Sequence, residues 1–220
     1  MLKKFILLIF LPIAILSYHC SPSYSGERLF YKVRWVDDGD TVVLSNGIRV
    51  RYIGINAPET DLVKSGNQLK TGEPFGGQAK ELNEKLVYRK NVRLEFDKDK
   101  YDEYGRLLAY VFLEDNTFVN ELLLLEGLAY CLPIKPNMRH SSLFLNAQRQ
   151  AMKKKKGIWR TVDKPTTGMK GNRRSLRFHL PGCRFGKTIS IKNTVSFKSV
   201  YDAFHEGFAP CKRCNPTGKE

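Results

Sequence analysis

Three short runs of the chain combine carboxylates with arginines in a pattern that suits the cleavage of phosphodiester bonds. Asp40 lies in the run DGDT, Arg51 and Glu59 stand at the two ends of the run RYIGINAPE, and Arg106 ends the run DEYGR. One carboxylate can hold a divalent cation, a second can orient or deprotonate water, and two guanidinium groups can neutralise the charge that builds up on phosphorus. The three runs are therefore candidates for one hydrolytic site.

The three runs, with apolar strands between them, resemble the staphylococcal nuclease family from about Tyr31 to Trp159. Each run alone is weak, since Asp-Gly pairs are common in turns and surface arginines are commonly just solvated, but the runs occur in the family's order. The resemblance implies that Asp40 binds calcium, that Arg51 and Arg106 hold the scissile phosphate, and that Glu59 is the base. It also implies that water attacks in line and that the products carry a 3′ phosphate.

Asn56 departs from the family pattern, because the resemblance implies an acidic calcium ligand at this position. Its amide oxygen can coordinate calcium but brings no negative charge, so we expect a weaker or more permissive metal site. The resemblance further implies that the backbone carbonyl of Ala57 binds the ion and that the Thr41 hydroxyl lies just outside the ligands.

Contacts to the nucleotide are predicted mainly for the run DEYGR. The resemblance implies that Tyr104 contacts the nucleotide, and the alternative is a loop aromatic that packs on the barrel. Glu103 stands where the family often has a lysine, which puts one phosphate contact in doubt. Tyr130 is a further candidate for stacking on a base, because stacking tolerates any base.

The apolar pattern over residues 28–160 predicts a β-rich α+β domain. We expect a five-stranded barrel of OB type with about three helices, which is also what the resemblance implies. Asn46 and Gly47 are a strong hairpin signal between two of the strands. Residues 61–75 lack periodicity and are expected to form a loop beside Glu59. The expected strands are 29–36, 41–44, 48–55, 92–96 and 107–113, and the expected helices are 77–88, 119–128 and 141–156.

A second, smaller unit is expected over residues 173–220, after a linker at 161–172. The spacing H-x3-C followed by C-x2-C is typical of tetrahedral zinc, and a unit this short needs such a staple. The alternative is that the cysteines of this unit and Cys131 form disulfides. The predicted zinc ligands are His179, Cys183, Cys211 and Cys214.

This unit is similar to the metal-binding domain of the Ada family of DNA alkylation-repair proteins, including the stretch 197–209. In that family the first ligand is a cysteine that accepts a methyl group, and here it is His179, so we do not expect methyl transfer. The resemblance leaves structural zinc and contact with the DNA backbone. The candidate phosphate ligands are Arg173, Arg174, Arg177, Lys212 and Arg213.

The positive charge of the chain is concentrated at its C-terminal end. The 220 residues carry a formal net charge of +15, and residues 151–220 hold 17 Lys and Arg against 4 Asp and Glu. Such a region favours a polyanionic partner, with DNA or RNA the best candidate and anionic lipid another. The run of four lysines at 153–156 has a plainer interpretation, because it could simply solvate the end of a helix.

The N-terminus has the features of a signal peptide over residues 1–20. Two lysines precede a short apolar run at 5–18, which is too short to span a bilayer comfortably. Cys20 indicates lipidation and a lipid anchor, whereas cleavage within residues 21–25 or an uncleaved anchor are the alternatives. We therefore expect an exported protein, either a cell-envelope lipoprotein or a secreted one.

Together these patterns predict an exported, calcium-dependent endonuclease that acts on DNA and on RNA as a second candidate, with a zinc module that aids nucleic-acid binding. The alternatives are a nucleic-acid-binding surface protein without catalysis, and a basic adhesion or membrane-peripheral protein. The sequence indicates no protein partner.

Overall fold

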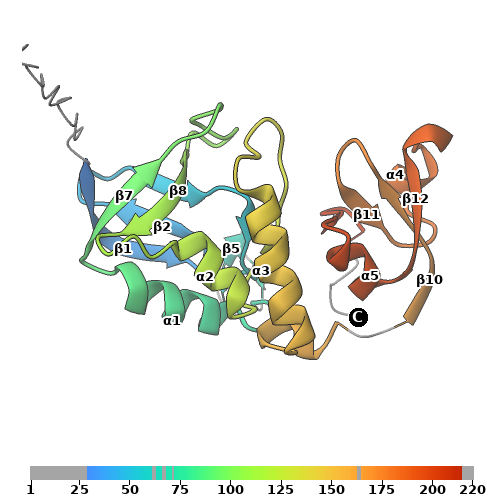
Figure 1. The fold of residues 1–220 in the computed structure, drawn as a ribbon, viewed down its shortest axis with the longest axis horizontal. Coiled ribbons are helices and arrows are strands. Elements are labelled where there is room, and N and C mark those ends of the chain that lie inside the picture. The colour runs from blue at the N-terminus through green and yellow to red at the C-terminus, as the bar shows by residue number, and fades with distance from the viewer. Residues whose placement is uncertain (1–28, 61–62, 66–67, 71, 163–164, 215–220) are drawn as a thin grey trace, which may run out of the picture.

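The computed structural model describes residues 29–60, 63–65, 68–70, 72–162 and 165–214. The predicted signal peptide and Cys20 lie outside these residues. Figure 1 shows a barrel with its helices, and a smaller C-terminal module on the far side of helix α3. None of the helices in the described ranges is long and apolar enough to cross a membrane.

A closed barrel of five strands forms the larger part, in the order β1-β2-β3-β8-β7. The barrel confirms the predicted fold class, and its one parallel pair joins β3 to β8. The hairpin between β2 and β3 turns at Asn46 and Gly47, as predicted, and Gly47 has a φ of 84°. The strands are β1 (Phe30–Asp38), β2 (Thr41–Leu44), β3 (Arg49–Tyr52), β7 (Asn91–Glu95) and β8 (Leu107–Leu113).

Three helices pack around the barrel, close to the predicted ranges: α1 (Gly76–Val87), α2 (Val119–Leu125) and α3 (Ser141–Lys153), followed by a 3-10 turn η1 (Gly157–Arg160). In the leucine-rich α2, Leu123 and Leu124 are fully buried. The barrel core contains many β-branched residues, which suit a pleated surface. Its fully buried valines include Val33, Val42, Val50, Val92 and Val111.

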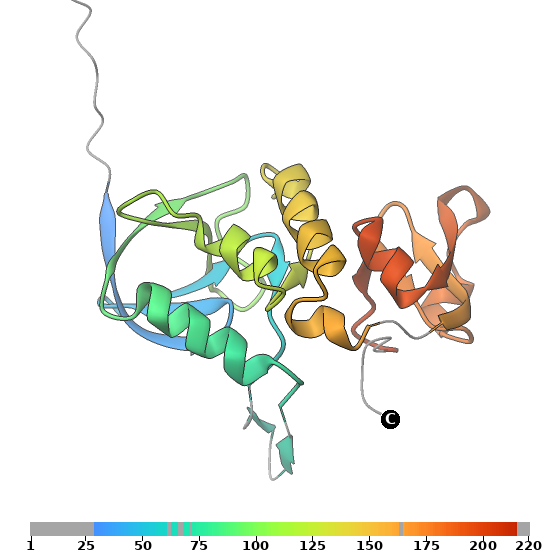
Figure 2. The same ribbon diagram turned by 60° about the horizontal axis from the view of Figure 1, so that its bottom comes forward.

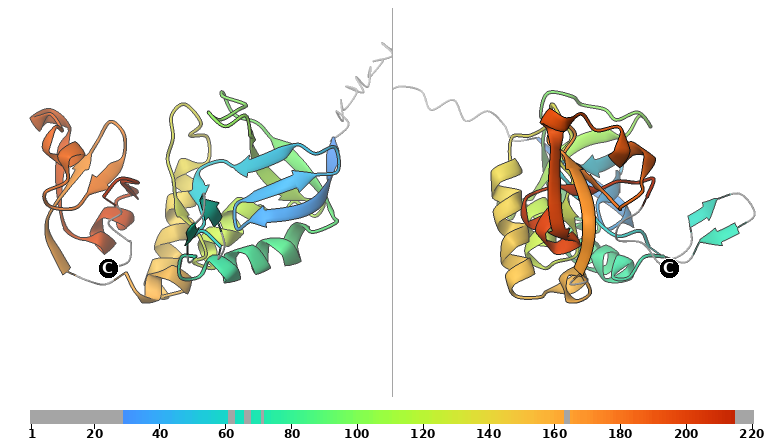
Figure 3. Two further views of the ribbon diagram at one scale, coloured as in Figure 1. Left: turned by 180° about the vertical axis from the view of Figure 1, so that it is seen from behind. Right: turned by 90° about the vertical axis from the view of Figure 1, so that its right-hand side faces the viewer.

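The predicted strand 48–55 is interrupted, because the chain turns at Gly54, where φ is 79°. Beyond this turn lies a short strand β4 (Ile55–Asn56), which pairs with β9 (Tyr130–Cys131) in a separate two-stranded sheet. The segment 61–75, expected to be a loop, contains the paired strands β5 (Val63–Ser65) and β6 (Gln68–Lys70). This hairpin extends away from the barrel (Figure 3).

The C-terminal module is a four-stranded sheet in the order β12-β10-β11-β13. Strand β10, the first of the module in chain order, occupies most of the segment 161–172 that we expected to be a linker, so the connection is shorter than predicted. The sequence did not indicate this strand because its Gly and Thr residues show no apolar periodicity. The elements are β10 (Pro165–Asn172), β11 (Arg177–His179), α4 (Arg184–Lys187), η2 (Ile191–Asn193), β12 (Thr194–Ser199), α5 (Val200–His205) and β13 (Ala209–Pro210).

The module shares a hydrophobic core with the barrel part of the chain. Helix α5 lies beside α3, as two views show (Figures 1 and 2). Ala151, Met152 and Trp159 belong to the same buried cluster as the aromatic residues of the module. Those aromatics are Phe178, Phe197, Phe204 and Phe208. Burial of apolar area on both sides therefore attaches the module to α3.

Candidate active site

Asp40 and Arg51 form a buried ion pair at the start of the second barrel strand. Asp40 lies in the turn between β1 and β2, and the register pairs Thr41 with Arg51 across the β2–β3 hairpin. The Asp40 Oδ2 and Arg51 Nη2 atoms lie 2.9 Å apart, with both side chains 10 % exposed or less. Thr41 donates its hydroxyl to Asp40 Oδ1 at 3.0 Å.

The guanidinium of Arg51 is fixed by backbone carbonyls as well as by Asp40. Its Nη1 donates to the carbonyls of Tyr52 and Ile55, at 2.6 and 2.9 Å. Its Nη2 also donates to Asn56 Oδ1 at 3.0 Å. These bonds hold a planar cation in one orientation before any ligand arrives.

Asn56 and Ala57 complete a closed network with Asp40. The backbone N–H of Ala57 donates to Asp40 Oδ2 at 2.8 Å, and Asn56 Nδ2 donates to the Ala57 carbonyl at 3.0 Å. Asn56 Nδ2 also donates to the Tyr130 hydroxyl at 3.1 Å. The structure thus brings together Asp40, Thr41, Arg51, Asn56 and Ala57.

Gly39 lets the Asp40 turn approach these residues. A Cβ at this position would lie 2.6 Å from the Cβ of Ala57 and 2.7 Å from the Cβ of Ala79 in α1. Both neighbours are fixed by backbone, so a larger residue would push β4 or α1 away from the turn.

The side chain of Asp38 was not assigned a role from the sequence, and it interacts electrostatically with both Glu59 and Asp40. Burial first, and then the negative charges of Asp40 and Glu59 and a hydrogen bond with Glu59, raise the pKa of Asp38 to about 7, although the hydrogen bond from the Gly39 N–H opposes this shift. The predicted base therefore lies next to Asp38 and close to the Asp40 charge. The DGDT run itself held the signal, since it carries two carboxylates two residues apart.

The backbone of Glu59 is held by the segment before α1. The Glu59 N–H donates to Glu73 Oε2 at 3.1 Å, and the Glu73 N–H donates to the Glu59 carbonyl at 2.9 Å. The Glu59 side chain is exposed, so solvent and substrate can reach it.

Arg106 lies in the loop directly before β8, the strand next to β3. Its neighbour Leu107 pairs with Val50, the residue before Arg51. Arg106 Nε lies 2.7 Å from Asp102 Oδ2, and its guanidinium carbon lies 5.3 Å from the centre of the Tyr104 ring. Arg106 is thus held by its own loop, directly before the strand beside that of Arg51, and the 70 % exposed Tyr104 does not pack on the barrel.

The oxygen atoms around Asp40 are of the chemical types that bind calcium. A carboxylate, an amide oxygen and a backbone carbonyl are hard oxygen ligands, and Asp40, Asn56 and Ala57 offer them within one hydrogen-bonded network. Arg51 Nη2 contacts the same oxygens of Asp40 and Asn56. A cation and Arg51 would therefore share these ligands, which fits a weaker site.

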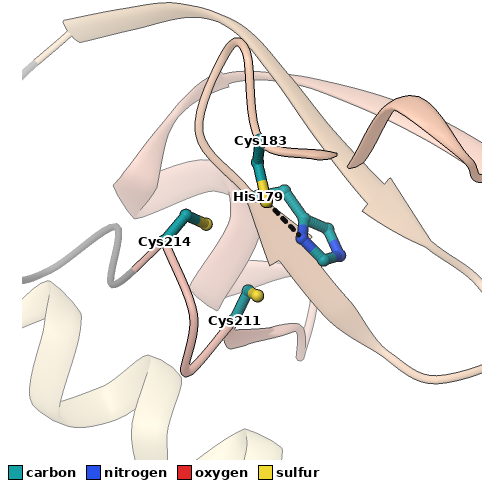
Figure 4. A group of neighbouring side chains, drawn as sticks. All are labelled: His179, Cys183, Cys211 and Cys214. Atoms are coloured by element: carbon teal, nitrogen blue, oxygen red, sulfur yellow. Dashed lines mark hydrogen bonds between the residues drawn. The ribbon is translucent and has the colours of Figure 1, made fainter. Parts of the chain in front are cut away.

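The four predicted zinc ligands converge in the C-terminal module (Figure 4). One ligand atom from each of the four residues lies within 4.8 Å of the others. Cys183 Sγ lies 3.5 Å from His179 Nδ1, and the Leu180 N–H donates to Cys214 Sγ at 3.4 Å. In a tetrahedral site with zinc–sulfur bonds of about 2.3 Å, the ligand atoms lie about 3.8 Å apart, so this cluster fits zinc.

The described cysteines do not form the disulfides of the alternative interpretation. Cys131, Cys183, Cys211 and Cys214 are all free. Cys131 lies in the barrel core, where burial raises the pKa of its thiol to about 12. It therefore belongs to the packing of the barrel.

The candidate phosphate ligands of the module lie in two environments. Four of them are exposed: Arg173, Arg174, Lys212 and Arg213. The fifth, Arg177, is largely buried, and its Nη1 donates to the carbonyls of Pro133 and Leu176, each at 3.3 Å. Burial lowers the pKa of Arg177. Arg177 is thus part of the contact with the barrel domain, which its sequence neighbours did not reveal.

Comparison with known proteins identifies the larger part of the chain. Residues 49–161 match the family model of staphylococcal nuclease homologues. The thermonuclease of Staphylococcus hyicus is 40% identical over 132 residues, which cover 59% of this chain and 75% of that protein. The thermonuclease of Staphylococcus intermedius is 40% identical over 142 residues, covering 63% and 80%.

A further relative comes from Bacillus subtilis. Its endonuclease YncB is 41% identical over 127 residues, which cover 56% of this chain and 57% of that protein. The matches, the closed barrel and the network around Asp40 agree with one another. The chain belongs to the staphylococcal nuclease family.

Proposed function

We propose that this chain is an exported, calcium-dependent endonuclease that hydrolyses phosphodiester bonds in DNA, with RNA as a second substrate, and leaves 3′-phosphate ends. Membership of the family and the thermonuclease and endonuclease relatives support a phosphodiesterase of this type. Export depends on residues 1–20, and the lipid anchor on Cys20, both outside the described part of the chain.

The chain's own residues divide the work in this proposal. Arg51 on β3 and Arg106 directly before the neighbouring strand β8 bind the phosphate and neutralise the charge that develops on it. Glu59, exposed and hydrogen-bonded to Asp38, orients and deprotonates the attacking water. Asp40, Asn56 and Ala57 would hold calcium, which when bound withdraws charge from the phosphate. Tyr104 lies beside Arg106, and its ring is exposed, so a bound nucleotide can reach it.

The observation that carries this proposal is the hydrogen-bonded network of Asp40, Arg51, Asn56 and Ala57. It joins a buried carboxylate, a fixed cation and two further oxygen ligands, and it comes from two motifs that are separate in sequence. Fixed groups of this kind need no rearrangement when charge develops in a transition state. A barrel that only bound nucleic acid would have no need of a buried ion pair beside an exposed carboxylate.

The C-terminal module is proposed to bind structural zinc and to hold the nucleic acid. The convergence of His179, Cys183, Cys211 and Cys214 supports the zinc site. The exposed cations Arg173, Arg174, Lys212 and Arg213 supply sequence-independent contacts with phosphates. Affinity for DNA should therefore fall steeply as salt is raised.

Cleavage of single- and double-stranded DNA with and without added calcium tests the proposal, with zinc held at one equivalent. Glu59→Ala and Arg106→Ala should each slow cleavage about 100-fold or more, because each removes a group that acts on the transition state. Glu103→Ala removes an exposed carboxylate of the same loop as Arg106 and should have little effect. DNA that is bound but left intact under all conditions would refute the enzyme and favour a binding protein.

A further inference from the structure

Tyr130 connects the calcium site proposed above to the C-terminal module. The register of the β4–β9 pair places Tyr130 opposite Asn56, and the Tyr130 hydroxyl accepts a hydrogen bond from Asn56 Nδ2 at 3.1 Å. On its other side the Tyr130 ring packs against Phe204 of α5, with 5.3 Å between the ring centres and 60° between the planes. One side chain thus touches a proposed metal ligand and an aromatic residue of the module.

Because residue 56 is an asparagine, the orientation of its side-chain amide decides whether it can bind a cation. A carboxylate has two equivalent oxygens, whereas an amide has one end that can bind a cation and one that repels it. The two acceptors of the Nδ2 hydrogens are the Ala57 carbonyl and the Tyr130 hydroxyl. With both in place, Oδ1 is directed toward Arg51 and the side of the network where Asp40 lies.

The C-terminal module holds Tyr130 firmly. Gln148 of α3 is fully buried; its Oε1 accepts from the N–H of Cys131, the residue after Tyr130, at 2.7 Å, and its Nε2 donates to the Phe204 carbonyl at 2.6 Å. Phe204 also packs against Phe178, 5.2 Å between ring centres, next to the zinc-ligand candidate His179. The backbone of Tyr130 and the ring that covers it are therefore fixed by the same contacts.

We propose that Tyr130 is a positioning residue for the calcium site: it orients the Asn56 amide, and Phe204 of the C-terminal module keeps it in place. This inference rests on the proposed calcium-dependent function. The module then does more than bind nucleic acid, because it also completes the calcium site.

Calorimetric measurement of the calcium dissociation constant on the full chain, without nucleic acid, tests the inference directly. Tyr130→Phe removes one hydrogen bond and keeps the ring, so calcium binding should weaken about five-fold. In the Asn56→Asp background the two oxygens are equivalent, and the same Tyr130→Phe change should have no effect on calcium binding. A Tyr130 residue with a merely structural role would weaken binding equally in both backgrounds, and that result would overturn the inference.

The contribution of the module is measured with a matched pair of core variants. Phe204→Leu should weaken calcium binding roughly two- to five-fold by loosening Tyr130. Phe197→Leu is the control, since Phe197 lies in the same core but packs against Phe208. Zinc content and thermal unfolding of both variants report whether the module is folded. Equal calcium affinity in the two variants would refute the part assigned to Phe204.

Asp40→Ala separates this inference from the function on which it rests. If this variant loses calcium binding while Tyr130→Phe does not change it, the calcium site stands and the positioning by Tyr130 is refuted. If Asp40→Ala binds calcium as the unchanged chain does, the proposed calcium site itself is wrong, and the inference falls with it.

Discussion

Replacement of Gln148 by leucine should show how strongly the C-terminal module is joined to the barrel domain. Gln148 has no exposed surface, and it bridges the Cys131 N–H and the Phe204 carbonyl. Leucine has nearly the same volume, so the cavity term is small and the main effect is the loss of two hydrogen bonds. The Cys131 N–H would be left buried without a partner, which costs about 1–3 kcal/mol, whereas the Phe204 carbonyl keeps a hydrogen bond from the Gly207 N–H, so its lost bond costs about 1 kcal/mol. We therefore expect a total loss of about 3 kcal/mol.

Urea unfolding followed by tryptophan fluorescence measures this loss, with zinc held constant. Trp159 is 3% exposed and lies in the shared core, while Trp35 is 53% exposed, so the change in emission should report mainly on the shared core. For a chain of this size a loss of about 3 kcal/mol should lower the melting temperature by roughly 9 °C. The unchanged chain should unfold in a single transition, because the two parts share one core.

The control is Gln150→Leu, a substitution of the same type on the exposed face of the same helix. It should change the free energy of unfolding by no more than about 0.5 kcal/mol. A Gln148→Leu variant that loses less than about 1 kcal/mol would show that its two bonds do not join the module to the barrel. Two separate transitions in the unchanged chain would contradict the reasoning as well.

Two further predictions concern the turn beside Asp40 and the metal cluster of the module. Gly39→Ala should destabilise the chain by about 1–3 kcal/mol and slow cleavage, because the new methyl group meets Ala57 and Ala79; Gly77→Ala, where nothing lies within 4 Å, should stabilise helix α1 slightly. Urea unfolding and a cleavage assay compare the two variants, and equal stability would contradict the clash. Metal analysis of the purified chain should find about one zinc per molecule, and Cys214→Ser should reduce this and lower the melting temperature; a zinc content near zero in the unchanged chain would exclude the site.

Much of the barrel could be predicted from the sequence because its signals are local. The turn at Asn46 and Gly47, the alternation in β7 and the apolar run of β8 each depend on neighbouring residues. The break at Gly54 and the strand β10 were missed. Both depend on partners distant in sequence: β4 pairs with β9, and β10 pairs with β12, so no local pattern marks them.

In the candidate site, too, the motifs predicted some contacts, whereas contacts between residues distant in sequence were not predicted. The motifs placed Asp40, Arg51, Asn56 and Ala57 together, and the structure brings these residues into one network. The link from Tyr130 to Asn56 spans 74 residues, and Gln148 lies 56 residues before its partner Phe204. The first contact depends on the pairing of β4 with β9 and the second on the packing of α3 against α5, and periodicity alone predicts neither.

The shared core also determines the shortest recombinant fragment in which all buried apolar residues stay covered. A recombinant fragment that stopped after Trp159, near the end of the family match, would leave Ala151, Met152 and Trp159 uncovered. That bare surface invites aggregation during expression and purification. Production of the barrel domain on its own would therefore require polar replacements on this face of α3; otherwise the C-terminal module must be kept.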